Sequence, residues 1–315
     1  MTDGGPRSAG AIAVIEIGGT SVRIGFALDG APFGEVQTTA TSRIRVADPI
    51  EALAALLRTA SEEAGIRPAM IVATVPGFID RDFDRVLHAA NIPELNGRLM
   101  ASELSSALGL PVRLERDVAL QLLGECRAGA AAGKAHVLGV YFGTGIGAAY
   151  VGDNGVFRGG GWALEIGHMP IEGGRRALPG LLAHRLEVYA SGRTLSALAE
   201  KHASPVAELF RAAPADPALD RALRKVVRIQ AYAVAGAVAL LSPRLVVLGG
   251  GVLDMADYPR ARLKTIIENH LPPPMSMVPF DVRWAALGER SAIHGAIQML
   301  ENQVVTAANT MNPGA

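Results

Sequence analysis

The feature that most constrains the fold is a pattern that occurs twice: a buried strand, a turn rich in glycine and threonine, and a returning strand. The first copy turns at Glu16-Ile17-Gly18-Gly19-Thr20, between strands expected at 11–17 and 21–28. The second turns at Gly143-Thr144-Gly145-Ile146-Gly147, between strands expected at 136–142 and 147–151. A third strand follows each copy, at 35–41 and 156–157, which makes two antiparallel meanders. A duplicated meander with helical crossovers predicts two α/β domains that face a cleft, with ligands bound between them.

The remaining periodicity predicts alternating helices and strands. Helices are expected at 49–64, 99–108, 118–128, 195–211, 219–241, 258–270 and 291–305, and further strands at 69–74, 112–115, 245–248 and 281–286. We expect residues 1–10 to be disordered, a small N-terminal α/β domain from 11–117 plus 291–315, and a large α/β domain from 118–290.

Composition excludes several classes of function. The 30 Lys and Arg residues balance the 30 Asp and Glu residues, so there is no basic excess to attract nucleic acid. No apolar run reaches the length of a membrane span of ~18 residues, and the polar N-terminus has no apolar signal core. Cys126 is the single cysteine, which excludes an intrachain disulfide and a cysteine-based zinc site. A soluble cytoplasmic protein with no nucleic-acid or membrane partner is therefore expected.

The two glycine turns are candidate phosphate sites. Backbone N–H groups of such turns, with a threonine hydroxyl, can face phosphate oxygens. The candidate ATP-binding residues are Gly18, Gly19 and Thr20 in the first turn, Gly143, Thr144, Gly145 and Gly147 in the second, and Gly249, Gly250 and Gly251 on the adenosine side. Glu16, at the end of the first strand, could hold Mg²⁺ through water. The alternative is that these are ordinary glycine turns.

Acidic residues at strand and helix ends are candidates for substrate chemistry. Asp117 follows a strand and is placed to act as a general base on a sugar hydroxyl, although it could instead be the N-cap of the following helix. Glu165, His168 and Glu187 carry groups that recognise vicinal hydroxyls, but they could also be surface glutamates and a packed histidine.

These motifs resemble those of the ROK (repressor, open reading frame, kinase) family of sugar kinases and regulators over about residues 11–300. The family's D-x-G-G-T reads EIGGT here, while its G-T-G-x-G, E-x-G-H, L-E-x-x-x-S-G and L-G-G-G patterns are present. The resemblance implies a two-domain actin/hexokinase-like ATPase fold (ribonuclease H-like), and a homodimer. It implies a kinase that uses ATP and Mg²⁺, with Asp117 as the base. It also implies sugar contacts from Asn91, Arg116, Asp117, Glu165, His168 and Glu187.

Within the family, RDVALQL at 116–122 and GGGVLDM at 249–255 resemble the D-allose kinases, which predicts D-allose as the sugar. Glucose, fructose, mannose and N-acetylhexosamines remain open as substrates. The family's helix-turn-helix regulators carry a long extra segment before the first strand, whereas about ten residues precede it here, so DNA binding is not expected.

The chain departs from the family pattern at four places. Glu16 replaces the usual Asp, Arg116 replaces an Asn, and Leu164 replaces a Gly, which would strain a leucine if that position needs positive φ. The family's zinc-binding cysteines map onto Leu178, Gly180 and Arg185, so no structural zinc is expected. We expect apolar packing by Leu178, Leu181 and Leu182 to hold that loop instead. These departures leave a second hypothesis open, a sugar-binding pseudokinase without turnover.

Overall fold

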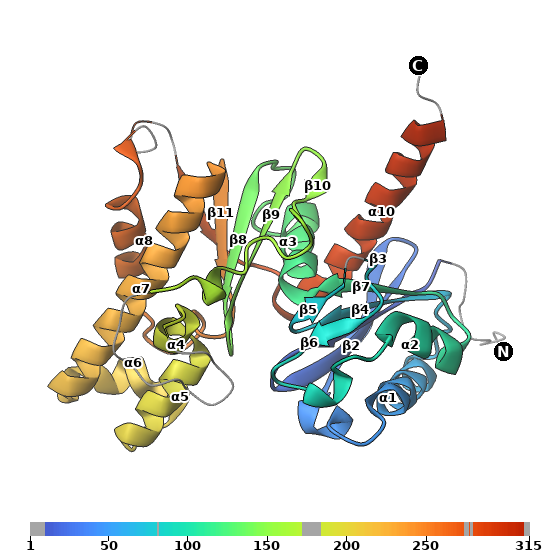
Figure 1. The fold of residues 1–315 in the computed structure, drawn as a ribbon, viewed down its shortest axis with the longest axis horizontal. Helices are drawn as coiled ribbons and strands as arrows, with labels where there is room; N and C mark the ends of the chain where they lie inside the picture. Colours follow the sequence, from blue (N-terminus) through green and yellow to red (C-terminus); the bar gives the residue numbers. More distant parts are fainter. Residues whose placement is uncertain (1–9, 81, 172–183, 274–276, 278–279, 312–315) are drawn as a thin grey trace, which may run out of the picture. The chain divides into compact units, whose positions relative to one another are not determined.

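The computed structural model describes residues 10–80, 82–171, 184–273, 277 and 280–311, without the side chains of 303–311 (Figure 1). The expected disorder at 1–10 therefore lies almost wholly outside the described residues. The chain divides into two compact units. Unit 1 comprises Met1–Ala132, Arg158–Trp162 and Ala286–Ala315, and unit 2 comprises Gly133–Phe157 and Ala163–Ala285.

Unit 1 is built on a five-stranded sheet in the order β3-β2-β1-β4-β7. The strands are β1 (Ile12–Ile17), β2 (Ser21–Leu28), β3 (Ala31–Ala40), β4 (Met70–Val75) and β7 (Val112–Arg116). β1, β2 and β3 form the predicted antiparallel meander, and β1, β4 and β7 run parallel. β1 is apolar at almost every position because it is an inner strand covered on both faces. The carboxyl ends of β1, β4 and β7 therefore meet at one edge of the sheet.

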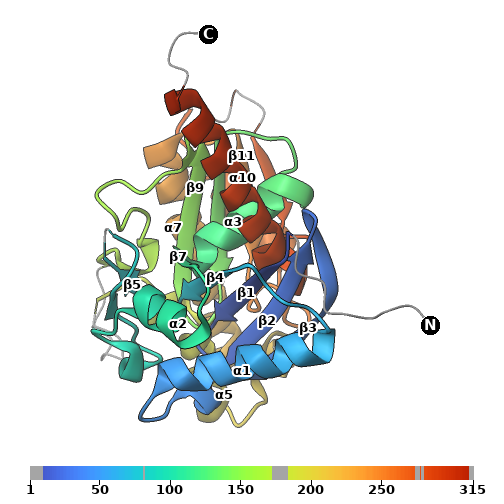
Figure 2. The ribbon, with the colours of Figure 1, turned by 90° about the vertical axis from the view of Figure 1, so that its right-hand side faces the viewer.

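Two helices of unit 1, α1 (Pro49–Ala64) and α2 (Met100–Leu108), belong to the same core as this sheet (Figure 2). The Asp48 carboxylate caps α1 by accepting hydrogen bonds from the N–H groups of Ile50 and Glu51, and Gly65 ends the helix in the left-handed conformation. A short hairpin of β5 (Phe78–Ile79) and β6 (Val86–His88) follows β4.

Two glycines let the helices α3 (Asp117–Ala128) and α10 (Ser291–Met311) approach each other closely. A Cβ on Gly124 would lie 2.1 Å from the Ser291 carbonyl oxygen, and one on Gly295 would lie 1.8 Å from the Leu120 carbonyl oxygen. Because of this packing, unit 1 extends through α3 to Ala132, beyond the boundary at 117 that we expected from the sequence.

Unit 2 repeats the arrangement of unit 1 around a sheet in the order β10-β9-β8-β11-β12. Its strands are β8 (Val137–Phe142), β9 (Ile146–Gly152), β10 (Gly155–Val156), β11 (Leu245–Gly249) and β12 (Asp281–Trp284). β8, β9 and β10 form the second predicted meander, and β8, β11 and β12 run parallel. The helices are α4 (Glu187–Ala190), α5 (Gly192–Lys201), α6 (Leu209–Ala212), α7 (Pro217–Leu241) and α8 (Arg260–Glu268).

The predicted helix at 195–211 is wrong. The chain instead forms α5, leaves the helix at His202, passes Ala203 at a φ of 49°, and starts α6 only at Leu209. Pro205 explains the break, because it has no N–H to continue a helix and it disfavours helical backbone at Ser204. Within the described residues, no helix combines the length and apolar character needed to cross a bilayer.

Candidate functional site

The first glycine turn lies at the carboxyl end of β1, and its backbone is held from several sides. The Gly18 N–H donates to the Ser21 carbonyl oxygen at 2.8 Å, and the Thr41 hydroxyl donates to the Gly18 carbonyl oxygen at 2.9 Å. The Ile17 N–H donates to the Thr74 hydroxyl oxygen at 3.0 Å. Thr20 is exposed, so its hydroxyl is available to a ligand.

Glu16, the residue expected to contact Mg²⁺, is 6% exposed and already hydrogen-bonded. Its Oε2 accepts from Arg23 Nη1 at 3.2 Å, and its Oε1 accepts from Gln121 Nε2 at 2.7 Å. Each carboxylate oxygen has a second lone pair for a water of the ion's hydration shell, whereas direct coordination would compete with the Arg23 guanidinium. The carboxylate therefore fits a water-mediated contact to Mg²⁺ and does not fit direct coordination.

Asp117 stands at the same edge of the unit 1 sheet, where β7 ends and α3 begins. It is half-buried, and its Oδ1 accepts from the Val118 N–H at 2.8 Å. An N-cap carboxylate would accept from the second or third residue beyond itself, and the N-cap position of α3 is held by Arg116. The geometry thus differs from that of the capping alternative.

The chain just before Asn91 lies close to Gly77, in the loop that follows β4. A Cβ on Gly77 would lie 2.1 Å from the His88 carbonyl oxygen and 3.1 Å from the Ala89 Cα. Only a glycine allows the loop after β4 to lie so close to the end of β6. From there the chain continues to Asn91, which is half-buried.

The second glycine turn, in unit 2, packs against the segment that carries Glu187. The Gly192 N–H donates to the Gly143 carbonyl oxygen at 2.8 Å, and the Gly143 N–H donates to the Gly145 carbonyl oxygen at 3.0 Å. A Cβ on Gly145 would lie 2.9 Å from Glu187 Oε2. The second glycine turn and Glu187, a predicted sugar contact, therefore lie side by side.

The structure brings two of the predicted sugar contacts together. His168 Nε2 lies 3.8 Å from Glu187 Oε1, and Glu187 is 7% exposed, on the first turn of α4. Glu165 is half-buried and precedes a short 3₁₀ turn that ends at His168. Leu164 has a φ of 67°, which confirms that the position adopts the conformation favoured by the family's glycine.

The segment that corresponds to the family's zinc loop is described only in part. Leu178, Gly180, Leu181 and Leu182 lie outside the described residues, so their predicted packing is not tested. Arg185 is described, and its Nη1 donates to the His168 carbonyl oxygen at 2.9 Å. The Leu186 N–H also donates to the Met169 carbonyl oxygen at 3.0 Å. These bonds hold the backbone of His168.

The Gly249-Gly250-Gly251 turn follows β11, where adenosine is expected to bind. Gly250 has a φ of 96°, and a Cβ on it would lie 2.5 Å from the Phe142 carbonyl oxygen. A side chain at this position is thus excluded both by conformation and by the neighbouring strand. Gly251 is exposed, and its Cβ position is open.

Sequence reasoning missed one buried charge next to Asp117. Glu115, 1% exposed, accepts two hydrogen bonds from Arg158 and one from the Arg116 N–H. The sequence does show Glu115 at the end of the strand expected at 112–115, which indicates a carboxylate that needs a partner. It does not show which partner, because Arg158 lies 43 positions away in the sequence.

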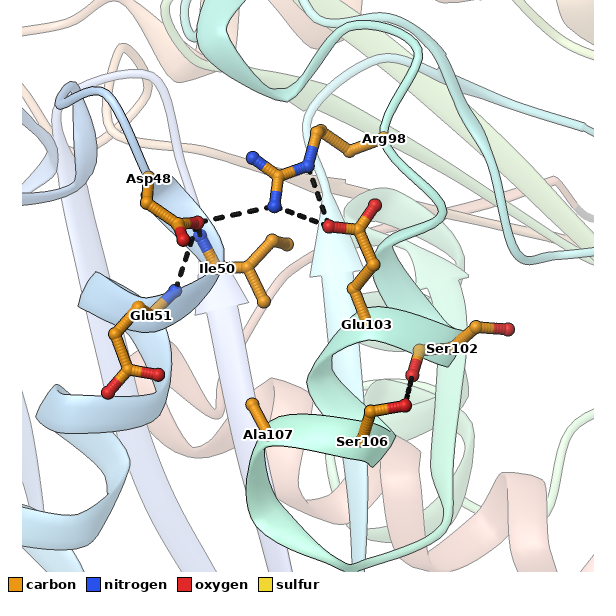
Figure 3. A pocket seen from close by; sticks show the side chains of 8 residues that line it. All are labelled: Asp48, Ile50, Glu51, Arg98, Ser102, Glu103, Ser106 and Ala107. Carbon is orange, nitrogen blue, oxygen red and sulfur yellow. Dashed lines mark hydrogen bonds and ion pairs between the residues drawn. The ribbon is translucent and has the colours of Figure 1, made fainter.

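A cavity of about 490 Å³ in unit 1 contains none of the predicted site residues (Figure 3). Eight residues of α1, α2 and their flanks line it: Asp48, Ile50, Glu51, Arg98, Ser102, Glu103, Ser106 and Ala107. Its guanidinium, on Arg98, is already bound by the carboxylates of Asp48 and Glu103. Hydrogen bonding and attraction to Arg98 lower the pKa of the Glu103 carboxyl despite its partial burial. We assign no substrate to this cavity.

The two-unit fold, with a glycine turn in each meander, defines an actin/hexokinase-like ATPase of the kind found in hexokinases. The sequence profile of the ROK family matches residues 12–303, and the chain belongs to that family.

Individual relatives agree with this assignment. A glucokinase of Thermotoga maritima is 25% identical over 310 residues, which is 92% of this chain and 97% of the relative. N-acetylgalactosamine kinase AgaK of Shewanella is 26% identical over 302 residues, covering 90% of this chain and 94% of the relative. The crystal structure of a ROK glucokinase from Streptomyces griseus in complex with glucose and AMPPNP superimposes with a TM-score of 0.78. Its identity is 25%, and the match covers 92% of this chain and 99% of that one.

Proposed function

We propose that the protein is an ATP-dependent hexose kinase that transfers the γ-phosphoryl group of ATP to the 6-hydroxyl of a sugar. The observation that carries the proposal is the shared sheet edge in unit 1. There the phosphate turn at Gly18 and the carboxylate of Asp117 follow parallel strands of one sheet. The family relationship supports the same activity.

In the proposed reaction, the Asp117 carboxylate takes the proton of the sugar hydroxyl as its oxygen attacks the γ-phosphorus. The bond between the γ-phosphorus and the β,γ-bridging oxygen breaks, and ADP leaves with that oxygen. Magnesium arrives as the MgATP substrate, where it neutralises phosphate charge. The two glycine turns offer N–H groups to the phosphates, and the turn at 249–251 accommodates adenosine.

Two observations bear on the identity of the hexose, and they favour different sugars. The segments at 116–122 and 249–255 favour D-allose. The relatives named as glucokinase and N-acetylgalactosamine kinase favour D-glucose or an N-acetylated hexosamine. D-Allose and D-glucose differ at C3 alone, so one or two hydrogen bonds to the hydroxyl at that carbon would decide between them.

A coupled ADP-release assay with MgATP and a panel of D-allose, D-glucose, D-fructose and N-acetylhexosamines tests this function. Turnover with one sugar would identify the substrate. Asp117→Asn should lower kcat by about 10²- to 10⁴-fold, the usual contribution of a general base, with little change in ATP binding. Asp153→Asn, a change at a 76% exposed carboxylate, serves as the matched control. Folded protein that binds a sugar but releases no ADP would support the pseudokinase instead. An Asp117→Asn variant with full activity would remove Asp117 from the role of base.

A further inference from the structure

The five residues Arg158–Trp162, here called the strap, belong to unit 1, although the chain on either side of them belongs to unit 2. The strap leads directly into Ala163, Leu164 at its positive φ, and the predicted sugar contact Glu165. Whatever fixes the strap therefore also fixes the start of a segment that the proposed function assigns to sugar binding.

The first anchor of the strap is an ion pair with Glu115. Arg158 Nη1 donates to Glu115 Oε1 at 2.8 Å, and Nη2 donates to Oε2 at 2.5 Å, so the guanidinium meets the carboxylate with two parallel bonds. Burial acts to lower the pKa of Arg158, but the hydrogen bond and attraction of Glu115 outweigh it and raise the pKa. The Arg158 guanidinium is therefore charged at neutral pH.

The same carboxylate reaches the backbone beside the proposed base. Glu115 Oε1 also accepts from the Arg116 N–H at 2.9 Å, at the point where β7 ends. The next residue is Asp117. One buried carboxylate thus connects the strap to the residue that precedes the base.

The second anchor holds the other end of the strap. The Trp162 indole N–H donates to the Ile79 carbonyl oxygen at 3.0 Å, and its ring packs edge-on against Phe78 at 6.2 Å between centroids. The Arg158 guanidinium also lies 4.7 Å from the centre of the Phe83 ring. The strap is therefore held at both ends, and Trp162, although 49% exposed, has a fixed orientation.

Stability alone is a weak reason for this ion pair. Taking Glu115 and part of Arg158 out of water costs free energy, and an apolar pair of similar size is often as stable or more so. What an apolar pair could not do is bind the Arg116 N–H and define one orientation of the strap.

We propose that Arg158 and Glu115 are positioning residues of the proposed kinase: their ion pair sets the backbone that carries Asp117 and holds the strap that leads to Glu165. The inference rests on the proposed function. A 1 Å displacement of a catalytic group lowers a rate by about 10²-fold, so losing this ion pair should lower kcat by about 10- to 100-fold.

Three variants separate positioning from stability. Arg158→Met leaves Glu115 buried without its partner, so it should lose both stability and kcat. The double variant Glu115→Gln/Arg158→Met carries no charge at either of these two positions, so its thermal stability should recover while kcat stays low and the KM for ATP stays within about twofold. Arg98→Met removes an Arg–Glu pair next to the cavity of unit 1 whose carboxylate is more exposed than that of Glu115, and it should keep its kcat. A double variant with the kcat of the original protein, or an equal loss of kcat in Arg98→Met, would overturn the proposal.

A second readout keeps the inference separate from the proposed activity. The chain has two tryptophans, Trp162 and Trp284, so the Trp284→Phe variant has Trp162 as its single tryptophan. Hexose should change the Trp162 fluorescence in this background, and it should bind at least tenfold more weakly after the Glu115→Gln/Arg158→Met change. If the unaltered protein binds hexose without releasing ADP, the proposed function fails, yet this titration still decides whether the pair orders the strap. Equal hexose affinity with and without the pair would refute the positioning role.

Discussion

The close packing of α3 on α10 predicts that a substitution that should favour the helix will instead lower the stability of the protein. Replacing Gly295 by Ala should raise the helix propensity of α10 by about 1 kcal/mol. The new Cβ, however, would lie 1.8 Å from the Leu120 carbonyl oxygen, whereas ordinary contact begins near 3.4 Å. The obstacle is backbone, so one helix must move by about 1.6 Å or tilt away. Overpacking of this kind costs about 1–3 kcal/mol, at the upper end for a backbone clash, so we expect a net loss of about 2 kcal/mol.

The matched control for this change is Gly236→Ala in α7. It is the same substitution in another helix interior, but there the nearest atom to the new Cβ is the Met169 Cε at an ordinary 3.9 Å. This variant should be about 1 kcal/mol more stable, because only the helix-propensity term remains. Thermal and urea unfolding of both variants measure the difference, which should be about 3 kcal/mol. Because α3 begins at Asp117, Gly295→Ala should also lower kcat. A Gly295→Ala variant as stable as Gly236→Ala would refute the close packing of α3 on α10.

Two further predictions concern an acid-sensitive histidine and a strained leucine. Burial, aided by Arg127 and Arg290, lowers the pKa of His294, so the unfolded chain binds a proton there more readily than the folded protein does. The free energy of unfolding should therefore be highest above pH 6.5 and should decrease as the pH falls below that value. In unfolding curves measured from pH 7.5 to 5, His294→Leu should show a smaller decrease in this free energy. For Leu164→Gly, relief of the left-handed conformation gains about 1–2 kcal/mol. The same substitution removes a half-buried apolar side chain and raises the conformational entropy of the unfolded chain. Together these two effects destabilise the protein by about as much as the relief of strain stabilises it, or by more. We expect a melting temperature equal to or slightly below that of the original protein, and a clear rise would contradict this balance.

Much of the fold follows from the sequence because inner strands such as β1 and β8 are short apolar runs that end at glycine turns. Leu164 was predicted to be strained if its position needs positive φ, and it has that conformation. By contrast, β5 and β6 have only two and three residues, too few for an alternating pattern. Their pairing depends on how closely Gly77 approaches His88, which no local pattern reveals.

The candidate site was predicted as a set of residues, while its supporting contacts were not. The glycine turns and Asp117 stand out locally because they interrupt or end apolar runs. The pairing of Glu16 with Gln121 and of Glu115 with Arg158 joins residues 105 and 43 positions apart, and only the folded chain brings them together. Such contacts are set by tertiary packing rather than by local propensity.

The composition of unit 1 from three separate stretches has a consequence for how the protein is made. A ribosome completes the sheet and α3 early, but it delivers α10, the helix that covers Gly124 and Leu120, only after the whole of unit 2 has been synthesised. Unit 2 is therefore the first unit whose residues are all available to fold. Until α10 has been synthesised, the side of α3 that carries Gly124 and Leu120 lacks its partner helix, so nascent unit 1 cannot complete its packing before unit 2 has been made.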